Sequence, residues 1–410
     1  VFRSPGPDGA LSLVQGRRAL AGLGVQRYEL IEEEVAAIPA AELAVEQALH
    51  LHAQYPKELE FGFPSPLNGQ CYQLRSRGYV GVVPLGADAA LEINPKIRCS
   101  LLMPMLEYAY QLPKISEHKA PATMGDIYEF WAEVLARKVL QRVRRGLLWD
   151  YQTREGLSRW VRGRMYPERS GLGVHPYCRF SEHTPDIIDN RILANALYGL
   201  RRFAFRRESV RQMVGRAWWA LSELNYRHIR PADCLGVAYH RLNEDYRPMH
   251  ALCYPLLQQR SPTWGLGDEE GPAYLLHMPT LFERFCTAFI DHKLSHKVEL
   301  KAQYHTRLKG TERLSFRLDM ALFSAATGQP LAVVDAKYKA DGPLESDVQQ
   351  VVAYAVQLDT RRAFLLYPSS DVDEQFEVGP VAVQALGYDF EAEDIEKAGQ
   401  GVIRSIENVI

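Results

Sequence analysis

Two expected strands near the C-terminus, separated by a short turn, constrain the fold more than any other part of the sequence. Residues 314–323 alternate polar and apolar side chains as a half-buried strand does, and residues 331–338 form the apolar run of a buried strand. The segment 324–330, Ser-Ala-Ala-Thr-Gly-Gln-Pro, has the composition of a turn. We therefore expect the two strands to pair as a hairpin.

This hairpin carries three charged residues, Asp319 on its first strand and Asp335 and Lys337 on its second. Because side chains alternate along a strand, Asp335 and Lys337 share a face, and pairing can bring Asp319 beside them. Two carboxylates and an ammonium group on one face form a site for a hard divalent cation and a phosphate. The alternative is a solvated face, but Val333 and Val334 argue against it, because charges in a buried strand need a compensating partner.

Three further polar side chains lie on helices expected before and after the hairpin. Glu283 belongs to a helix over 281–294, where it can instead close the helix N-terminus in a capping box with Thr280. Gln350 and Tyr354 are four residues apart, so they lie on one helix face and can reach the same point. The alternative for this pair is a polar stripe on an amphipathic helix.

The composition is that of a globular protein with two or three domains, since the chain has 410 residues of which 47% are hydrophobic and 24% charged. No apolar run reaches the length of a membrane span, and no signal-peptide pattern is present. The six cysteines form no Cys-x-x-Cys pair, which argues against a zinc ribbon or a disulfide framework. We therefore expect a cytoplasmic protein that does not associate with a membrane.

The net charge of −2 hides an uneven distribution. Residues 137–164 hold nine Lys and Arg against two Asp and Glu, and residues 191–211 hold six against one. Residues 365–410 hold ten Asp and Glu against two Lys and Arg. The basic segments can supply phosphate contacts to DNA. Alternatively, their arginines pair with the acidic tail or solvate helices.

Two clusters in the basic segments are candidates for binding double-stranded DNA or a partner protein. The first is expected to be an exposed loop of alternating basic and aromatic or apolar residues, and the second ends a helix over 127–145, where the helix dipole favours cations. The first cluster can also be an ordinary arginine-rich loop. The residues are Arg159, Trp160, Arg162 and Arg164 in the first cluster, and Arg144 and Arg145 in the second.

The order of elements predicts an α+β multidomain chain in three parts. Residues 1–115 form a β-rich docking domain, residues 116–275 a mainly helical, basic region, and residues 276–410 an α/β domain with a mixed sheet flanked by helices. A linker is expected over 254–272. The other expected helices cover 40–55, 187–205 and 345–358, and the other expected strands cover 71–76, 78–85, 89–94, 298–306 and 362–367.

The polar residues of the last part follow a known order. Glu283, Asp319, Asp335-Ala336-Lys337 and Gln350-Val-Val-Ala-Tyr354, on helix, strand, strand and helix, resemble the PD-(D/E)xK nuclease superfamily. The Gln-x-x-x-Tyr addition is typical of its RecB-like branch. Leu318 stands where the proline of the superfamily's name would be, which is a common variation.

Other motifs extend the resemblance over nearly the whole chain. They are Leu-Glu-Ile-Asn-Pro-Lys-Ile at 91–97, Val-Arg-Gly-Arg-Met at 161–165, the run 178–193 and Met-Pro-Thr-Leu-Phe-Glu at 278–283. In this order they resemble the McrC family, the nuclease subunit of McrBC modification-dependent restriction systems. The resemblance implies an endonuclease acting on DNA with 5-methylcytosine-type modification. It also implies a partner, an McrB-like AAA+ GTPase hexamer, on which the N-terminal part of this chain docks and whose GTPase it stimulates. The chain has no Gly-x-x-x-x-Gly-Lys-Ser/Thr loop, so GTP should belong to the partner.

The expected chemistry is hydrolysis of a phosphodiester with Mg²⁺ held by Asp319, Asp335 and the Ala336 carbonyl, and with Glu283 adding a ligand through water. Lys337 would orient or deprotonate the attacking water and offset charge on the phosphate. The remaining pair, Gln350 and Tyr354, would position the lysine or the DNA backbone.

Two alternatives remain open. The chain could be a regulatory adaptor that activates an AAA+ NTPase with an inactive nuclease domain, although the intact Asp-Ala-Lys triplet speaks against decay. It could also be a free-standing RecB-like exonuclease, although the absence of a motor motif and the large non-nuclease N-terminal portion disfavour this.

Overall fold

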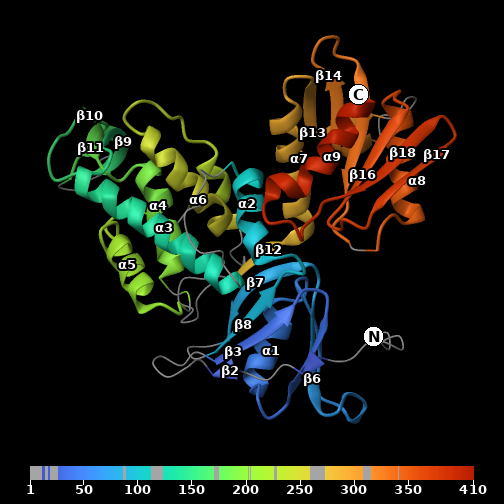
Figure 1. The fold of residues 1–410 in the computed structure, drawn as a ribbon. Coiled ribbons are helices and arrows are strands. Elements are labelled where there is room, and N and C mark those ends of the chain that lie inside the picture. The colour runs from blue at the N-terminus through green and yellow to red at the C-terminus, as the bar shows by residue number, and fades with distance from the viewer. Residues whose placement is uncertain are drawn as a thin grey trace. The chain divides into compact units, whose positions relative to one another are not determined.

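The computed structural model divides the chain into two compact units. The first joins residues 1–127 to residues 274–410, and the second comprises residues 128–273. Figure 1 shows both units as mixtures of helices and strands, which confirms the expectation of a mixed α and β fold with several sheets. The division into three parts stays a prediction. The structure describes residues 12–13, 17–18, 26–85, 89–111, 123–169, 175–201, 203, 205–225, 229–258, 273–307, 315–339 and 341–410.

Two sheets form the N-terminal part of the first unit. The hairpin expected over 78–94 is present as β7 and β8, whose connecting residues 86–88 lie outside the described ones. Both strands are almost wholly buried, because apolar side chains follow one another on both faces. The first sheet has the order β1 (Ser12–Leu13), β4 (Val35–Pro39), β6 (Cys71–Ser76) and β5 (Leu59–Gly62), and the second β12 (Tyr274–His277), β7 (Tyr79–Pro84), β8 (Ala89–Asn94), β3 (Gln26–Ile31) and β2 (Arg17–Arg18).

One strand of the second sheet, β12, follows the second unit in the sequence. It pairs with β7 at Gly81, whose φ is +145° and where a Cβ would lie 1.9 Å from the Tyr274 carbonyl oxygen. Only glycine permits this approach. The linker expected over 254–272 is wrong at its start, because helix α6 continues to Gln258, and residues 259–272 lie outside the described ones.

The C-terminal part of the first unit is built on a mixed six-stranded sheet. β13, β14 and β15 are antiparallel, whereas β15, β16 and β18 are parallel and β17 closes the edge antiparallel to β18. The strand order is β13 (Val298–Arg307), β14 (Ser315–Ser324), β15 (Pro330–Ala336), β16 (Arg362–Tyr367), β18 (Val381–Gly387) and β17 (Asp373–Val378). The sequence predicted the first four of these within a few residues and did not predict the last two.

Helices surround this sheet. α8 crosses from β15 to the parallel β16, and its buried Val351 and Ala355 pack on a core that includes Leu318, Val333 and Leu365. α2 and α9 both pack on α7 (Figure 1). The helices of the first unit are α1 (Val45–Gln54), α2 (Cys99–Ala109), α7 (Met278–Leu294), α8 (Glu345–Gln357) and α9 (Ile395–Val409), with the 3₁₀ turn η1 (Pro66–Asn68).

The second unit combines helices with a small antiparallel sheet, ordered β10-β11-β9. The exposed loop expected around Arg159, Trp160 and Arg162 lies between β9 and β10, two strands that the sequence did not predict, and Arg164 belongs to β10. The sequence hides them, since β9 is exposed along most of its length and lacks an apolar face. The helices are α3 (Met124–Arg145), which begins at the boundary of the units, α4 (Ile188–Leu200), α5 (Glu208–Trp219) and α6 (Arg247–Gln258), and the strands are β9 (Asp150–Leu157), β10 (Arg164–Met165) and β11 (Tyr177–Thr184), with 3₁₀ turns η2 (Pro167–Arg169), η3 (Pro231–Cys234) and η4 (Glu244–Tyr246).

Among the described segments, none of the helices is both long and apolar enough to cross a membrane. All six cysteines lie in described segments and are free thiols.

Candidate active site

The expected hairpin brings Asp319 and Asp335 to adjacent positions. β14 and β15 are antiparallel, with Met320 opposite Val334. Asp319 precedes the first residue of this pair and Asp335 follows the second. The Ala336 amide donates a hydrogen bond of 3.4 Å to Asp319 Oδ2, which ties the two strands together beside the carboxylates.

Lys337 directly follows β15, and polar contacts fix both its backbone and its side chain. Its backbone amide donates to the Leu366 carbonyl of β16 at 2.8 Å. Its Nζ lies 2.7 Å from Asp335 Oδ2 and donates to Gln350 Oε1 at 2.8 Å. Lys337 and Asp335 therefore meet on one side of the sheet, as the period of a strand predicts.

Gln350 and Tyr354 continue this chain of contacts along α8. Gln350 Nε2 donates to the Tyr354 hydroxyl at 2.8 Å, and the Tyr354 ring meets Phe316 of β14 edge-on, with centroids 5.4 Å apart. Both side chains are half-buried. Gln350 thus bridges Lys337 and Tyr354, so the alternative of a solvated polar stripe is wrong.

Asp335 is a buried carboxyl group. It is 1% exposed, and neither of its oxygens has a hydrogen bond of good geometry, so the ion pair with Lys337 is its close polar contact. Burial, followed by repulsion from Asp319, raises the pKa of Asp335 to about 7, although Lys337 opposes the shift. Burial lowers the pKa of Lys337, but attraction to Asp335 outweighs this and the pKa is raised. Lys337 is therefore a cation at neutral pH.

Glu283 lies in the second turn of α7 and faces the same carboxylates. Burial, and then the charge of Asp319, raises the pKa of Glu283. The capping-box alternative is wrong, because α7 begins at Met278 and Thr280 already lies in its first turn, where its hydroxyl meets His277 Nδ1 at 2.8 Å. Glu283 is thus free of a capping role.

Two residues of the site next to Glu283 were not predicted from the sequence. The side-chain amide of Gln303 donates to Glu283 Oε1, and Arg317 Nε donates to the carbonyl oxygen of the same Gln303 amide. Arg317 stands two residues before Asp319, which was a usable signal. Nothing in the sequence marks Gln303, because its role depends on how β13 pairs.

The donor groups fit a hard divalent cation. The buried oxygens of Asp335 lack hydrogen bonds, and burial followed by repulsion from Asp319 raises its pKa, so a bound cation would stabilise its charged form. Among the described residues, no group of three or more His, Cys, Asp and Glu side chains is close enough to hold a metal. The protein would therefore supply two carboxylates and the Ala336 carbonyl, and water and phosphate the rest, as is usual for Mg²⁺.

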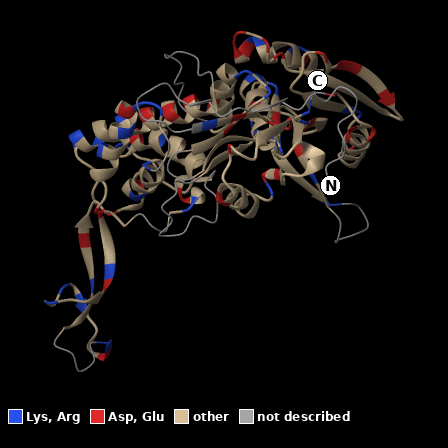
Figure 2. Ribbon diagram, turned by 90° about the horizontal axis from the view of Figure 1, so that it is seen from below, with Lys and Arg blue, Asp and Glu red and all other residues tan. Residues whose placement is uncertain are grey.

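The first basic cluster lies in the second unit, between β9 and β10. Figure 2 shows this three-stranded sheet extending from the helices of that unit as an arm. Trp160 is 71% exposed and Val161 is 64% exposed. The guanidinium of Arg162 lies 5.4 Å from the centroid of the Phe180 ring, and that of Arg164 lies 5.4 Å from the Tyr166 ring, while Arg159 is also exposed. The cluster therefore presents cations and apolar side chains together.

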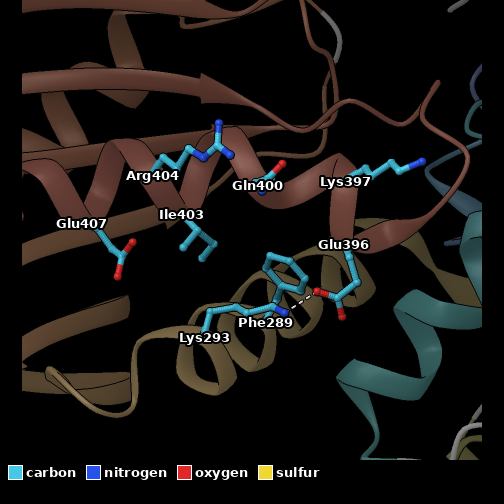
Figure 3. A pocket seen from close by; sticks show the side chains of 8 residues that line it. All are labelled: Phe289, Lys293, Glu396, Lys397, Gln400, Ile403, Arg404 and Glu407. Atoms are coloured by element: carbon cyan, nitrogen blue, oxygen red, sulfur yellow. Dashed lines mark ion pairs between the residues drawn. The ribbon is translucent and has the colours of Figure 1, made fainter.

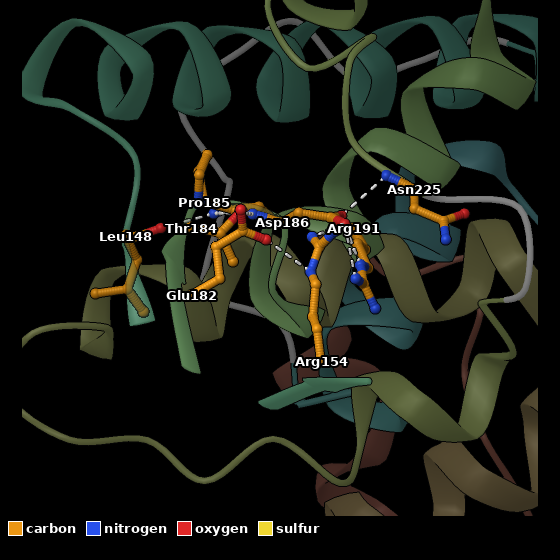
Figure 4. A network of polar contacts seen from close by, with 9 residues as sticks. Leu148, Arg154, Glu182, Thr184, Pro185, Asp186, Arg191 and Asn225 are labelled. Carbon is orange, nitrogen blue, oxygen red and sulfur yellow. Dashed lines mark hydrogen bonds and ion pairs between the residues drawn. The ribbon is translucent and has the colours of Figure 1, made fainter. Parts of the chain in front are cut away.

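A polar network anchors this arm to the helices (Figure 4). Asp186, just after β11, accepts hydrogen bonds from Arg191 Nε and Nη2 at 2.7 and 2.8 Å. It accepts another from the backbone amide of Asn225 at 2.9 Å. It also pairs with Arg154 of β9 at 3.4 Å. The hydrogen bonds from Arg191 lower the pKa of Asp186, although burial opposes them. Asp186 thus connects β9 and the end of β11 to α4 and to the segment that follows α5.

The second basic cluster lies at the end of α3. Arg142 pairs with Asp245 at 3.2 Å, whereas Arg145 and Arg241 line an open depression of about 660 Å³ without an ion pair among the described residues. Arg144 is exposed beside them. The ion pairs of Arg137, Arg142, Arg154, Arg191 and Arg207 are made with acidic residues of the same unit.

A crevice of about 350 Å³ between α7 and α9 is separate from the carboxylate site. Figure 3 shows Phe289 of α7 and Ile403 of α9 pointing toward each other, with charged residues that include Lys293, Glu396 and Glu407 around them. Lys293 Nζ contacts Glu396, and Glu407 pairs with Lys297 at 3.2 Å.

A family model for a "McrBC 5-methylcytosine restriction system component" matches residues 74–368, which include both the N-terminal hairpin and the carboxylate site. The chain belongs to this family. The resemblance to McrBC proteins seen in the sequence is confirmed. No curated protein matches the chain.

Two solved structures from Thermococcus gammatolerans are similar to this McrBC component. One is described as a half-complex from a tetradecameric assembly of McrB AAA+ hexamers with bound McrC. It has a TM-score of 0.60 at 17% identity and covers 94% of this chain and 100% of the other. The other is an McrBC complex with a TM-score of 0.46 at 16% identity, covering 94% and 100%. At this identity the first match supports a shared fold.

Proposed function

We propose that this chain is the Mg²⁺-dependent endonuclease subunit of a two-component restriction system that acts on double-stranded DNA with 5-methylcytosine-type modification. The observation that carries the proposal is the buried Asp335, which lies beside Asp319, lacks hydrogen bonds and has the Lys337 ammonium 2.7 Å away. Lys337 offsets the charge of one of the two adjacent carboxylates, and the second charge costs free energy until a further cation binds. Membership of the McrBC family supports the restriction system.

The metal would lie against Asp319, Asp335 and the Ala336 carbonyl. When bound there, Mg²⁺ polarises the phosphate and acidifies a bound water. Glu283 is half-buried and faces Asp319, so it would accept a hydrogen bond from a water on that side. Burial and the charge of Asp319 raise the pKa of Glu283, so a nearby cation would stabilise its charged form.

Lys337 would orient the attacking water and offset negative charge on the phosphate. Gln350 accepts a hydrogen bond from one of its three N–H donors, Asp335 lies 2.7 Å from the ammonium, and the side chain remains 23% exposed, which leaves a donor for the reaction. Because its pKa is raised, we assign it charge stabilisation and orientation, and not proton removal. Gln350 and Tyr354 would hold the ammonium in place.

The proposed partner is an McrB-like AAA+ GTPase hexamer, which would carry the GTP. The structural likeness to a complex of McrB hexamers with bound McrC supports this partner, and so does the absence of a phosphate-binding loop from the sequence. The exposed Trp160, Val161 and neighbouring arginines of the arm fit a protein surface or DNA. The arginines at the end of α3, including Arg144 and Arg145, are proposed as phosphate contacts. A cytoplasmic location agrees with the free thiols.

The test is to purify the chain with an McrB-like AAA+ protein and to incubate methylated and plain DNA with Mg²⁺ and GTP. We expect internal cleavage of methylated DNA by the wild type and none by a folded Asp335→Asn variant. Stimulated GTP hydrolysis without any cleavage by the wild type would identify an adaptor. Degradation of DNA ends by this chain alone would identify an exonuclease.

A further inference from the structure

Gln303 has an unusual backbone conformation next to the carboxylate site. It lies within β13, yet its φ is +50°, in the left-handed region that non-glycine residues rarely occupy. Ala302 pairs with Met320 and Tyr304 pairs with Leu318. Gln303 therefore lies opposite Asp319 of the adjacent strand β14. Such strain persists only where the surroundings hold it, and irregular strands beside active sites often redirect a side chain.

Both ends of the Gln303 amide are engaged. The Nε2 group donates to Glu283, and the Oε1 atom accepts from Arg317 Nε. An amide that both donates and accepts has one allowed orientation, so it fixes the Arg317 guanidinium relative to Glu283. The two charged groups are bridged by the amide, and they form no ion pair with each other within the described residues.

Arg317 is an exposed cation with unused donors. Its Nε is bonded to Gln303, while its two Nη groups make no hydrogen bond or ion pair in the described part of the chain. Arg317 lies close enough to Glu283 to oppose the rise of its pKa, and Asp319 acts on the same carboxyl. The free edge of the guanidinium is therefore held beside the carboxylates. A guanidinium edge with two parallel N–H groups matches the oxygens of a phosphate.

We propose that Arg317 binds a backbone phosphate of DNA at the carboxylate site and that Gln303 is the residue that positions it. This inference rests on the proposed nuclease function and names how the substrate is held. Asp319 and Asp335 repel the phosphate backbone until a cation is bound, and Arg317 supplies a fixed positive charge that offsets this repulsion. The strained φ of Gln303 is the cost of holding the guanidinium in that orientation.

Binding is measured first, without cleavage, for the chain in complex with its partner, using a DNA duplex in EDTA at several salt concentrations. We expect Arg317→Gln to weaken binding several-fold and to reduce the slope of log K against log salt by about 0.9, which is the loss of one phosphate contact. Arg317→Lys should retain the slope, because the charge remains. The matched control is Arg362→Gln, which removes an exposed arginine at the start of β16. Arg362 lies three residues before Leu365, and Leu365 pairs with Asp335.

Cleavage with Mg²⁺ then tests the positioning role of Gln303. We expect Gln303→Asn, which tolerates a positive φ but is too short to bridge, to lower cleavage about tenfold. The double variant with Arg317→Gln should be no worse than Arg317→Gln alone, because both changes remove one function. A purely structural role for Gln303 would make the two losses multiply, and thermal melting shows whether each variant is folded.

The possible outcomes separate this inference from the function on which it rests. If the wild type cleaves and Arg317→Gln matches Arg362→Gln in salt slope and in rate, the phosphate role is overturned and the nuclease assignment stands. If Gln303→Asn and Arg317→Gln lose activity multiplicatively, Gln303 does not act through Arg317. If the wild type neither binds nor cuts DNA in the presence of its partner, both proposals fail together.

Discussion

The hydroxyl of Tyr338 donates a hydrogen bond to Glu32, a residue 306 positions earlier in the chain. Tyr338 directly follows Lys337, and Glu32 directly follows β3 of the N-terminal sheet and is 0% exposed. The Lys96 amide donates to the same Glu32 oxygen at 3.0 Å. Within the first unit, a buried polar junction thus connects the N-terminal sheet to the segment that carries the candidate catalytic lysine.

We expect Tyr338→Phe to lower the free energy of unfolding by about 1–3 kcal/mol, because Glu32 is left buried with one donor fewer. Burial already raises the pKa of Glu32, and its other carboxylate oxygen has no hydrogen bond. Cleavage should fall at the same time, since Lys337 loses the support of its neighbour. Thermal melting and a nuclease assay on the purified variant measure the two effects.

The control for this change is Tyr72→Phe. Tyr72 is 3% exposed and packs against Phe61, but its hydroxyl makes no hydrogen bond among the described residues. We expect this variant to match the wild type within about 0.5 kcal/mol. Equal stability and equal activity of Tyr338→Phe and Tyr72→Phe would show that the junction contributes nothing.

The pKa of Asp335 predicts an unusual dependence of stability on pH for the metal-free protein. Its ordinary value is 3.8 and its value in the fold is about 7, so the folded state holds a proton that the unfolded state has lost between these limits. The contribution of Asp335 to stability is therefore complete below pH 3.8 and is lost as pH rises through about 7. The maximum slope is about 1.4 kcal/mol per pH unit.

Denaturant unfolding of the wild type and of Asp335→Asn from pH 4 to pH 8 isolates Asp335 together with the groups coupled to it, because the remaining titrating groups cancel in the difference. We expect the wild type to lose stability relative to Asp335→Asn as pH rises. Mg²⁺ should restore the wild type more at pH 8 than at pH 5, because it binds the charged carboxylate. A difference that does not vary with pH would contradict the assignment of a buried, metal-seeking Asp335.

The site residues that follow local rules could be predicted from the sequence. The two-residue period of a strand placed Lys337 with Asp335, and the helical spacing of four placed Gln350 with Tyr354. In contrast, the role of Glu283 as a helix cap was wrong because the start of α7 depends on β12, which ends at His277 against β7. The left-handed φ of Gln303 could not be predicted either, because its contacts with Glu283 and Arg317 join residues far apart in the sequence.

The same limit applies to the fold. Apolar runs such as 89–94 and 331–338 identify buried strands by themselves, because burial selects apolar side chains. The strands of the arm have few buried residues, so their pairing leaves little trace in the sequence. The joining of residues 274–277 to the N-terminal sheet is a long-range contact that no local pattern records.

We expect Glu283→Gln to reduce Mg²⁺-dependent cleavage by about tenfold or more with little change in melting temperature. Glutamine keeps the oxygen that accepts from Gln303 but removes the charge that faces Asp319. It also relieves repulsion between buried carboxylates, so stability should hold or rise slightly. A loss of melting temperature in proportion to the loss of activity would instead indicate a structural role.

Cleavage and partner activation should be separable, because the candidate metal ligands lie after residue 280 and the arm lies in the other compact unit. We expect Asp335→Asn to abolish cleavage, a loss of 10²-fold or more, and yet to bind the AAA+ partner and stimulate its GTP hydrolysis as the wild type does. The double change Trp160→Ala and Arg162→Ala removes an exposed aromatic side chain and a cation from the arm. We expect it to weaken partner binding and the stimulation of GTP hydrolysis, and to leave the carboxylate site unchanged. GTP hydrolysis and cleavage are measured on the same preparations. Loss of stimulation by a folded Asp335→Asn, as complete as its loss of cleavage, would show that the two activities share one site.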